Sequence, residues 1–210
     1  MSGRHRASEL HLIRHAQALP LPEQDEPGWA LSPLGESQAR ALIAVLGPLG
    51  IRRLYCSPYR RCRATLAPFA EQAEIEVVLD PGLRERRIAA VWMSDFRDVW
   101  WRSWADFSYA LEGGESSLVC RARIAAAVEA IVTRHAGEII GLGSHGNAIG
   151  LFMNYVDPAF GLAEATCLRT PEVVKILHHD GKFSWDRSFS AGEIFDGLAT
   201  DFRATPGVVA

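Results

Sequence analysis

The chain has 210 residues, of which 48% are hydrophobic and 22% are charged. This composition supports one sizeable core and excludes disordered and fibrous classes, so we expect a single domain over residues 1–210. The formal net charge of -3 provides no overall basic field, and no local basic patch stands out. The sequence therefore predicts no nucleic-acid partner.

The sequence pattern favours a cytoplasmic protein. No run of 18 or more apolar residues occurs, which argues against a transmembrane helix and a membrane partner. The basic first ten residues lead into no apolar run of the secretory type. The cysteines form no Cys-x-x-Cys pair, which favours reduced thiols over disulfides or a zinc site. They are Cys56, Cys62, Cys120 and Cys167.

Strands and helices are predicted to alternate along most of the chain. In chain order the predicted elements are a strand at 10–13, a Pro-rich loop at 18–29, a helix at 31–50, a strand at 52–58, a helix at 60–73, a strand at 75–80 and a turn at 81–87. An irregular or helical stretch at 91–114, a helix at 117–137, a strand at 138–146 and a hairpin at 172–185 follow. This alternation indicates an α/β layered fold with a mainly parallel sheet.

Residues suited to binding an anion follow four of the predicted strands. Arg14 and His15 follow the first strand, residues 57–61 follow the second, Glu85 follows the third and residues 144–146 follow the fourth. In open α/β sheets, ligands bind outside the carboxyl ends of the strands. A single histidine at a strand end is more often structural, but four such strand ends together predict an anion site at one edge of the sheet.

The residue types at this edge fit phosphoryl transfer. The planar fork of arginine suits phosphate oxygens. An imidazole can attack phosphorus in line and form a covalent intermediate. A carboxylic acid can protonate the leaving oxygen and then, as a carboxylate, activate water. If the arginines and a protonated histidine supply the positive charge, this chemistry requires neither a metal nor a cofactor.

Five motifs resemble, in order and spacing, those of the histidine phosphatase superfamily, which is also called phosphoglycerate mutase-like. They are LIRHAQ, CSPYRRCRAT, LRE, GGES and GSHGNAI, and the resemblance covers about residues 9–155. It implies a three-layer sandwich with a mainly parallel central sheet flanked by helices. It also implies that His15 is the nucleophile that becomes phosphohistidine, that Glu85 is the proton donor and that His145 is the second pocket histidine. The phosphate-binding residues that it implies are Arg14, Arg61 and Asn147, with Glu115 as a pocket neighbour.

Three segments depart from the family pattern. Ala16 stands where glycine is usual, and RRIAAVW follows Glu85 where a glycine and then a tryptophan are common. ALPLPEQ replaces the hydrophilic, asparagine-containing stretch of the mutases, which argues against a mutase. We expect a metal-independent phosphomonoester hydrolase that acts on a small-molecule phosphate ester. A phosphoglycerate mutase-type phosphotransferase, a phosphoprotein phosphatase and an inactive phosphate-binding member are the alternatives.

A helical, aromatic-rich insert at about 86–114 is expected to select the substrate. A helical stripe is predicted to face the core, formed by Phe96, Trp100, Trp104, Phe107 and Leu111. Trp101 lies off this stripe and is a candidate lid or substrate-stacking residue. Four arginines either bind a second anion or are solvated, namely Arg86, Arg87, Arg97 and Arg102. The insert is also compatible with a homodimer surface. His178 and His179 lack a third ligand at a suitable spacing, so no metal site is predicted there.

Overall fold

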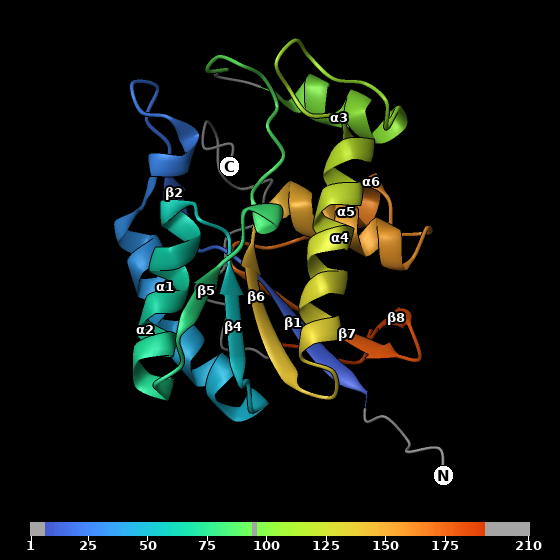
Figure 1. The fold of residues 1–210 in the computed structure, drawn as a ribbon. Helices are drawn as coiled ribbons and strands as arrows, with labels where there is room; N and C mark the ends of the chain where they lie inside the picture. The colour runs from blue at the N-terminus through green and yellow to red at the C-terminus, as the bar shows by residue number, and fades with distance from the viewer. Residues whose placement is uncertain (1–6, 94–95, 192–210) are drawn as a thin grey trace.

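The computed structural model describes residues 7–93 and 96–191, and a six-stranded sheet lies at the centre of this part of the chain (Figure 1). The strand order is β5-β4-β6-β1-β7-β8. The first four strands in this order are parallel, and β7 and β8 are antiparallel to their neighbours. The predicted α/β fold with a mainly parallel sheet is therefore confirmed. The bounds are β1 Ser8–Arg14, β4 Arg53–Cys56, β5 Val77–Leu79, β6 Ile139–Ser144, β7 Glu172–His179 and β8 Lys182–Trp185.

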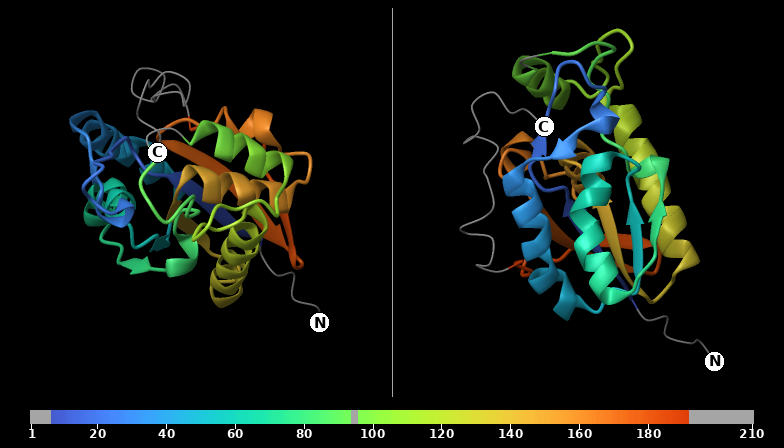
Figure 2. Two further views of the ribbon diagram at one scale, coloured as in Figure 1. Left: turned by 90° about the horizontal axis from the view of Figure 1, so that it is seen from above. Right: turned by 90° about the vertical axis from the view of Figure 1, so that its left-hand side faces the viewer.

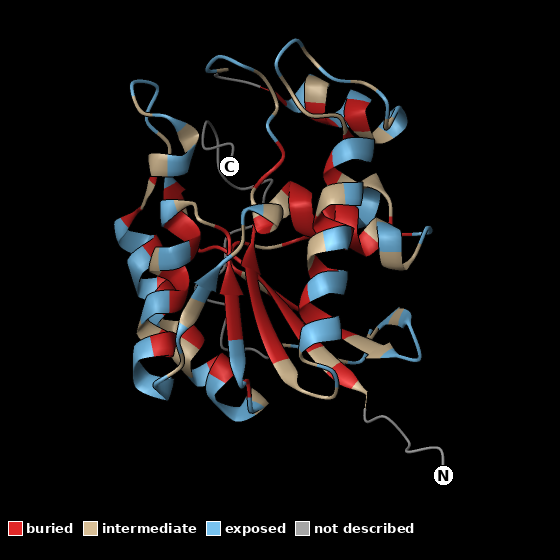
Figure 3. Cartoon of the chain, in the orientation of Figure 1, coloured by how far each residue is buried: buried red, intermediate tan, exposed pale blue. Residues whose placement is uncertain are grey.

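Helices cover both faces of the sheet and make three layers (Figure 2). Helices α1 (Pro33–Leu46) and α2 (Arg60–Ala73) pack on one face, and α4 (Ser117–Arg134) and α5 (Gly146–Val156) pack on the other. Successive residues of β1 point to opposite faces, so Leu12 joins one core and Ile13 joins the other. Both faces of β1 are therefore buried between Leu10 and Arg14. Figure 3 shows buried residues along the central strands and on the helix faces turned toward them.

Local capping agrees with the predicted helix starts. The Ser32 hydroxyl accepts a hydrogen bond from the Gly35 N–H at the start of α1, where Pro33 occupies the first turn. The Ser116 hydroxyl accepts from the Val119 N–H at the start of α4. The predicted hairpin also forms, because Asp180 and Gly181 both adopt the positive φ that its two-residue turn requires.

Short elements complete the layers. The Pro-rich loop is closed by a two-stranded ribbon and contains a 3-10 turn, and further 3-10 turns follow α1 and β5. Among the described residues, no helix is both long and apolar enough to cross a membrane. The bounds are β2 Ala18–Leu19, η1 Glu26–Gly28, β3 Ala30–Leu31, η2 Gly47–Leu49, η3 Pro81–Leu83, α3 Arg97–Ala105 and α6 Leu162–Ala165.

The helical stripe predicted for residues 96–111 is wrong in its second half. Helix α3 ends at Ala105, because the Asp106 carboxylate accepts hydrogen bonds from the N–H and hydroxyl of Ser108 and forms a turn. Trp100 is buried on α3 as predicted, whereas Phe107 lies beyond the helix and is only partly buried. The aromatic segment therefore packs on the core through a short helix and the turn that follows it.

His11 makes the stability of the fold sensitive to acid. Its side chain is 2% exposed on β1, and neither ring nitrogen has a hydrogen-bond partner in the described part of the chain. Burial lowers its pKa from 6.5 to about 4, while Glu9 opposes this shift and Lys175 adds to it. Between these pH values the unfolded chain binds a proton that the folded chain excludes. The contribution of His11 to stability is therefore complete above about pH 6.5 and is lost as the pH falls toward 4.

We expect His11→Leu to reduce the acid sensitivity of folding. Between pH 7.5 and pH 5, the free energy of unfolding should fall by about 2 kcal/mol less in the variant than in the wild type. Urea unfolding at both pH values measures this difference, and replacement of the exposed His179 by glutamine serves as the control. An identical pH dependence in the wild type and His11→Leu would contradict the assignment.

Candidate active site

The predicted site residues meet where three neighbouring strands of the sheet end. His15 follows β1, Ser57 follows β4 and His145 follows β6, and these strands occupy adjacent positions in the centre of the sheet. The His15 N–H donates to the Ser144 carbonyl at 3.1 Å, and the Ser57 N–H donates to the Gly143 carbonyl at 2.9 Å. The rings of His15 and His145 pack edge to face with centroids 5.2 Å apart. The structure therefore brings together residues 130 positions apart in the chain.

His15 is held with one ring nitrogen available to react. Its Nδ1 lies 2.7 Å from the Ala16 carbonyl oxygen, which can only accept, so the proton is on Nδ1 and Nε2 carries a lone pair. The Arg61 Nε donates to this lone pair at 3.1 Å. Burial lowers the pKa of His15 well below its ordinary value, and the charges of Arg61 and Arg14 lower it further. The neutral ring carries its lone pair on Nε2 and is the form that can attack phosphorus once Arg61 turns from this lone pair to the phosphoryl oxygens.

Arg14 is anchored by carbonyl groups and faces the site with unused donors. Its Nη1 donates to the Leu168 carbonyl at 2.8 Å and to the Arg169 carbonyl at 3.3 Å. Its Nε has no partner among the described residues. Burial lowers the pKa of Arg14 to about 10, so the guanidinium remains charged at neutral pH. A Cβ on Gly146 would lie 3.0 Å from this guanidinium, so glycine at the start of α5 leaves room for it.

Arg61 is paired with an acidic residue that the sequence analysis missed. Its Nη2 donates to the Glu26 carboxylate at 2.6 Å, and its Nη1 donates to the Glu26 carbonyl at 2.9 Å. The rings of Trp29 and Tyr59 lie 5.4 Å and 5.1 Å from its guanidinium carbon. Burial raises the pKa of Glu26, although Arg61 opposes this shift. An anion that binds Arg61 must therefore compete with Glu26, and no pattern in the Pro-rich loop indicates this pairing.

His145 is fully buried and hydrogen bonded to a second strand end. Its Nε2 lies 2.8 Å from the Ser57 hydroxyl and 3.4 Å from the Cys62 sulfur. Burial lowers the pKa of His145 well below its ordinary value, and the charges of Arg61, His15 and Arg14 add to this effect. The protonated form expected from the sequence is therefore disfavoured by the protein alone. A phosphate dianion in contact with the ring would favour that form.

Glu85 reaches the site from the predicted turn that follows β5. Strand β5 ends at Leu79, and the turn η3 lies between this strand and Glu85. The carboxylate is 4% exposed and accepts hydrogen bonds from the N–H groups of Arg86, Asn147 and Ala148 at 2.7, 3.1 and 3.0 Å. Two of these groups belong to the first turn of α5, where the helix dipole favours a negative charge. Glu85 is therefore fixed against the helix that follows His145.

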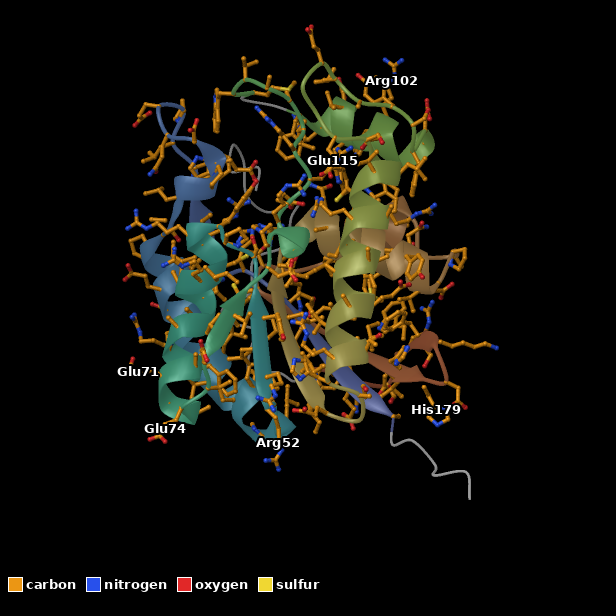
Figure 4. The ribbon with its side chains drawn as sticks, viewed as in Figure 1. Arg52, Glu71, Glu74, Arg102, Glu115 and His179 are labelled. Carbon is orange, nitrogen blue, oxygen red and sulfur yellow. The ribbon has the colours of Figure 1, made fainter. Side chains whose placement is uncertain are left out.

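Glu115 supports the segment that carries Glu85 from behind. Its carboxylate receives two hydrogen bonds from Arg123 of α4, at 2.8 and 2.7 Å, and one from Arg84 at 3.3 Å. Arg123 also donates to the carbonyls of Gly82 and Arg84 at 2.7 and 3.0 Å. Figure 4 shows Glu115 near the start of α4. Glu115 therefore neighbours the cavity through Arg84, which lines it, and is held by Arg123, which the sequence analysis missed.

A cavity of about 510 Å³ borders the site at Glu85 and Asn147, and its described lining does not include His15, His145, Arg14 or Arg61. Its walls come from the Pro-rich loop, from the segment after Glu85 and from Asn147, which is 8% exposed. Its aromatic lining consists of Trp29, Tyr59, Trp92 and Phe96. Trp29 and Trp92 meet edge to face at 5.6 Å. The prediction that Trp101 stacks on the substrate is not supported, since Trp101 is 55% exposed and is absent from the described lining.

The remaining charged residues singled out in the sequence lie apart from the cavity or on its rim. Figure 4 shows Arg102 on the outer side of α3 and His179 near the opposite end of the molecule from Glu115. The Arg102 guanidinium packs on the Tyr109 ring at 4.1 Å. Within residues 7–93 and 96–191, no group of three or more His, Cys, Asp or Glu side chains is arranged to hold a metal ion.

The fold and the clustered residues define an α/β protein of the phosphoglycerate mutase-like class. The chain belongs to the histidine phosphatase superfamily, whose branch 1 matches residues 10–189. Individual proteins match the chain at modest sequence identity. A probable phosphatase of Schizosaccharomyces pombe is 35% identical over 86 residues, which cover 37% of this chain and only 39% of that protein.

Two further comparisons extend over more of the chain. A probable phosphoglycerate mutase of an Enterobacter species is 26% identical over 159 residues, covering 70% of this chain and 74% of that protein. The structure of a mycobacterial glucosyl-3-phosphoglycerate phosphatase covers 90% of this chain and 99% of its own, with a TM-score of 0.71 and 22% identity. This last similarity concerns the fold alone.

Proposed function

We propose that this protein is a phosphomonoesterase that acts through a phosphohistidine on His15 and needs no metal. The observation that carries the proposal is the geometry of His15, whose Nδ1 is tied to the Ala16 carbonyl while Nε2 faces Arg61. Arg14 and Arg61 would bind the oxygens of the phosphoryl group, with His145 as a further donor once it is protonated. Membership of the superfamily supports a phosphatase in general, and the site supports this route.

The reaction would proceed in two displacements. In the first, the lone pair on His15 Nε2 attacks phosphorus, the bond to the ester oxygen breaks, and Glu85 in its acid form gives a proton to the leaving oxygen. In the second, Glu85 as a carboxylate takes a proton from water, and the water oxygen attacks the phosphohistidine. The phosphorus–nitrogen bond breaks, inorganic phosphate leaves, and Glu85 again holds a proton.

The cavity supports a small-molecule phosphate ester as the substrate. Its volume of about 510 Å³ lies within the usual range for small-molecule sites. Trp29 and Trp92 narrow the cavity from two different loops, which disfavours a folded phosphoprotein as substrate. We therefore place a small-molecule hydrolase ahead of a phosphoprotein phosphatase.

The test is hydrolysis of p-nitrophenyl phosphate by the wild-type protein in excess EDTA, combined with rapid quenching into alkali. Phosphohistidine survives alkali and is lost in acid, so mass spectrometry of the alkaline digest should find a phosphoryl group on the peptide that contains His15. Turnover that the chelator abolishes would refute the proposal. A phosphoryl group retained on His15 in water, with transfer to an added phosphoglycerate, would identify a mutase instead. Phosphate binding without turnover would identify an inactive member.

A further inference from the structure

Among the described residues, Arg86 is a buried cation in the cavity lining without a directly paired carboxylate. Its side chain is 2% exposed and, with Arg61, is among the largest fully buried side chains. Its Nη1 lies 3.4 Å from the Ser117 hydroxyl, which is a long hydrogen bond. Its Nε and Nη2 have no partner anywhere in the described ranges. Arg61 uses its donors on Glu26 and His15, whereas Arg86 leaves most of its donors unused.

The carboxylates near Arg86 are committed to other groups. Glu85 accepts three backbone N–H groups, and Glu115 binds Arg123 and Arg84. Burial lowers the pKa of Arg86, although the negative charges of Glu85 and Glu115 oppose this shift. A buried charge without a direct partner destabilises a folded chain. The fold by itself therefore gives no reason for an arginine at this position.

The location of Arg86 indicates a ligand that would supply the missing charge. Arg86 is one of the residues that line the cavity, and so are Glu85 and the cations nearest to it in the sequence, Arg84 and Arg87. The acidic residues Asp25 and Glu26 line the cavity from the Pro-rich loop, and Glu26 is bound to Arg61. The positive side of the cavity is therefore the segment 84–87. An arginine fork binds carboxylate and phosphate oxygens with two parallel hydrogen bonds.

We propose that Arg86 binds a second anionic group of the substrate, a carboxylate or a second phosphate. The inference rests on the proposed function and deepens it, because it assigns the substrate to the class of phosphate esters that carry another acid group. The Ser117 hydroxyl donates to the Ser103 carbonyl of α3 at 2.9 Å and faces the Arg86 Nη1 with its lone pair. This link orients the guanidinium and connects the second anion site to the aromatic insert.

Competitive inhibition of p-nitrophenyl phosphate hydrolysis tests the proposal. Three series of inhibitors of increasing chain length are compared: alkylphosphonates, phosphonoalkanoates with a terminal carboxylate, and alkane bisphosphonates. At one chain length, the inhibitor with a second anionic group should have an inhibition constant for the wild type about 10-fold or more below that of the alkylphosphonate of the same length. The carboxylate and bisphosphonate series distinguish the two kinds of anion. If neither series binds more tightly than the alkylphosphonates, the inference is wrong.

Three variants at two arginines locate the effect. In Arg86→Met, the ratio of the inhibition constant of the alkylphosphonate to that of the inhibitor with two anionic groups should fall to about one. Arg87→Met replaces the exposed neighbour and should keep the wild-type ratio. The ratio is internal to each variant, so a loss common to both inhibitors does not affect it. Arg86→Lys, which keeps the charge but not the fork, should keep part of the preference.

Thermal unfolding separates binding from a structural role. Because Arg86→Met replaces an unpaired buried charge with an apolar chain, its melting temperature should equal or exceed that of the wild type. A clear drop in melting temperature, or a preference for the second anion that survives in Arg86→Met, would overturn the assignment. Continued hydrolysis of p-nitrophenyl phosphate by the wild type without any such preference would reject the Arg86 site and leave the proposed function standing.

Discussion

Replacement of His15 by alanine is expected to reduce the turnover of p-nitrophenyl phosphate by about 10⁴-fold or more. The Nε2 lone pair of His15 is the one that the hydrogen bond to Ala16 leaves free, and it lies beside the Arg61 guanidinium. Steady-state rates measured in excess EDTA test this expectation.

Inorganic phosphate provides the control for His15→Ala. Arg14 and Arg61 remain in the variant, so phosphate should still inhibit residual activity or raise the melting temperature. Loss of both turnover and phosphate binding would indicate a collapsed pocket, and the role of His15 would then be tested with a second variant, His15→Asn. Turnover within a few-fold of the wild type in either variant would exclude His15 as the nucleophile.

Glu85→Gln should slow substrates with poor leaving groups far more than those with good ones. The leaving group of glycerol phosphate is an alkoxide, which needs a proton. The kcat for this substrate should therefore fall by about 10³-fold, against less than about 10-fold for p-nitrophenyl phosphate. The amide of glutamine has one acceptor oxygen, whereas Glu85 accepts N–H groups from α5 and from Arg86 with two oxygens. Some loss of stability is therefore expected in addition.

The ratio of the two rates isolates proton donation from general damage to the site. Both substrates are hydrolysed by the same variant protein under the same conditions. A general distortion of the pocket therefore lowers both rates and leaves their ratio unchanged. Glu115→Gln is the matched control for Glu85→Gln, because Glu115 contacts Arg123 behind the segment that carries Glu85 and does not contact the reacting atoms. Equal losses on both substrates in Glu85→Gln would mean that Glu85 is not the proton donor.

Elements that depend on local sequence were predicted closely. The helix predicted at residues 60–73 has the bounds Arg60–Ala73, and the hairpin turns at Asp180 and Gly181. Hydrophobic periodicity, caps and turn residues act over a few positions, so they can be read directly from the chain. Helix α5 was not predicted as a separate element, because most of its residues are buried and its sequence lacks the polar face that marks a surface helix.

The order of the strands was not predictable in the same way. Strand β6 inserts between β4 and β1, although it follows both in the chain. Two glycines of β6 accommodate its neighbours, since a Cβ at Gly141 would lie 2.7 Å from Leu54 and one at Gly143 would lie 2.7 Å from Leu66. Such contacts join residues far apart in sequence, and one chain gives no signal for them.

The sequence by itself determined the type of fold, the strand ends that carry chemistry, and the candidate residues His15, Glu85 and His145. These inferences depend on periodicity and motif spacing, which are properties of the chain before it folds. Only the tertiary structure decided that Glu26 binds Arg61, that Arg123 holds the segment that carries Glu85, and that Arg86 is buried with no counter-ion among the described residues. Each of these facts is a relation between side chains that non-local packing brings together, and packing also determines which charges lose their water and need a partner.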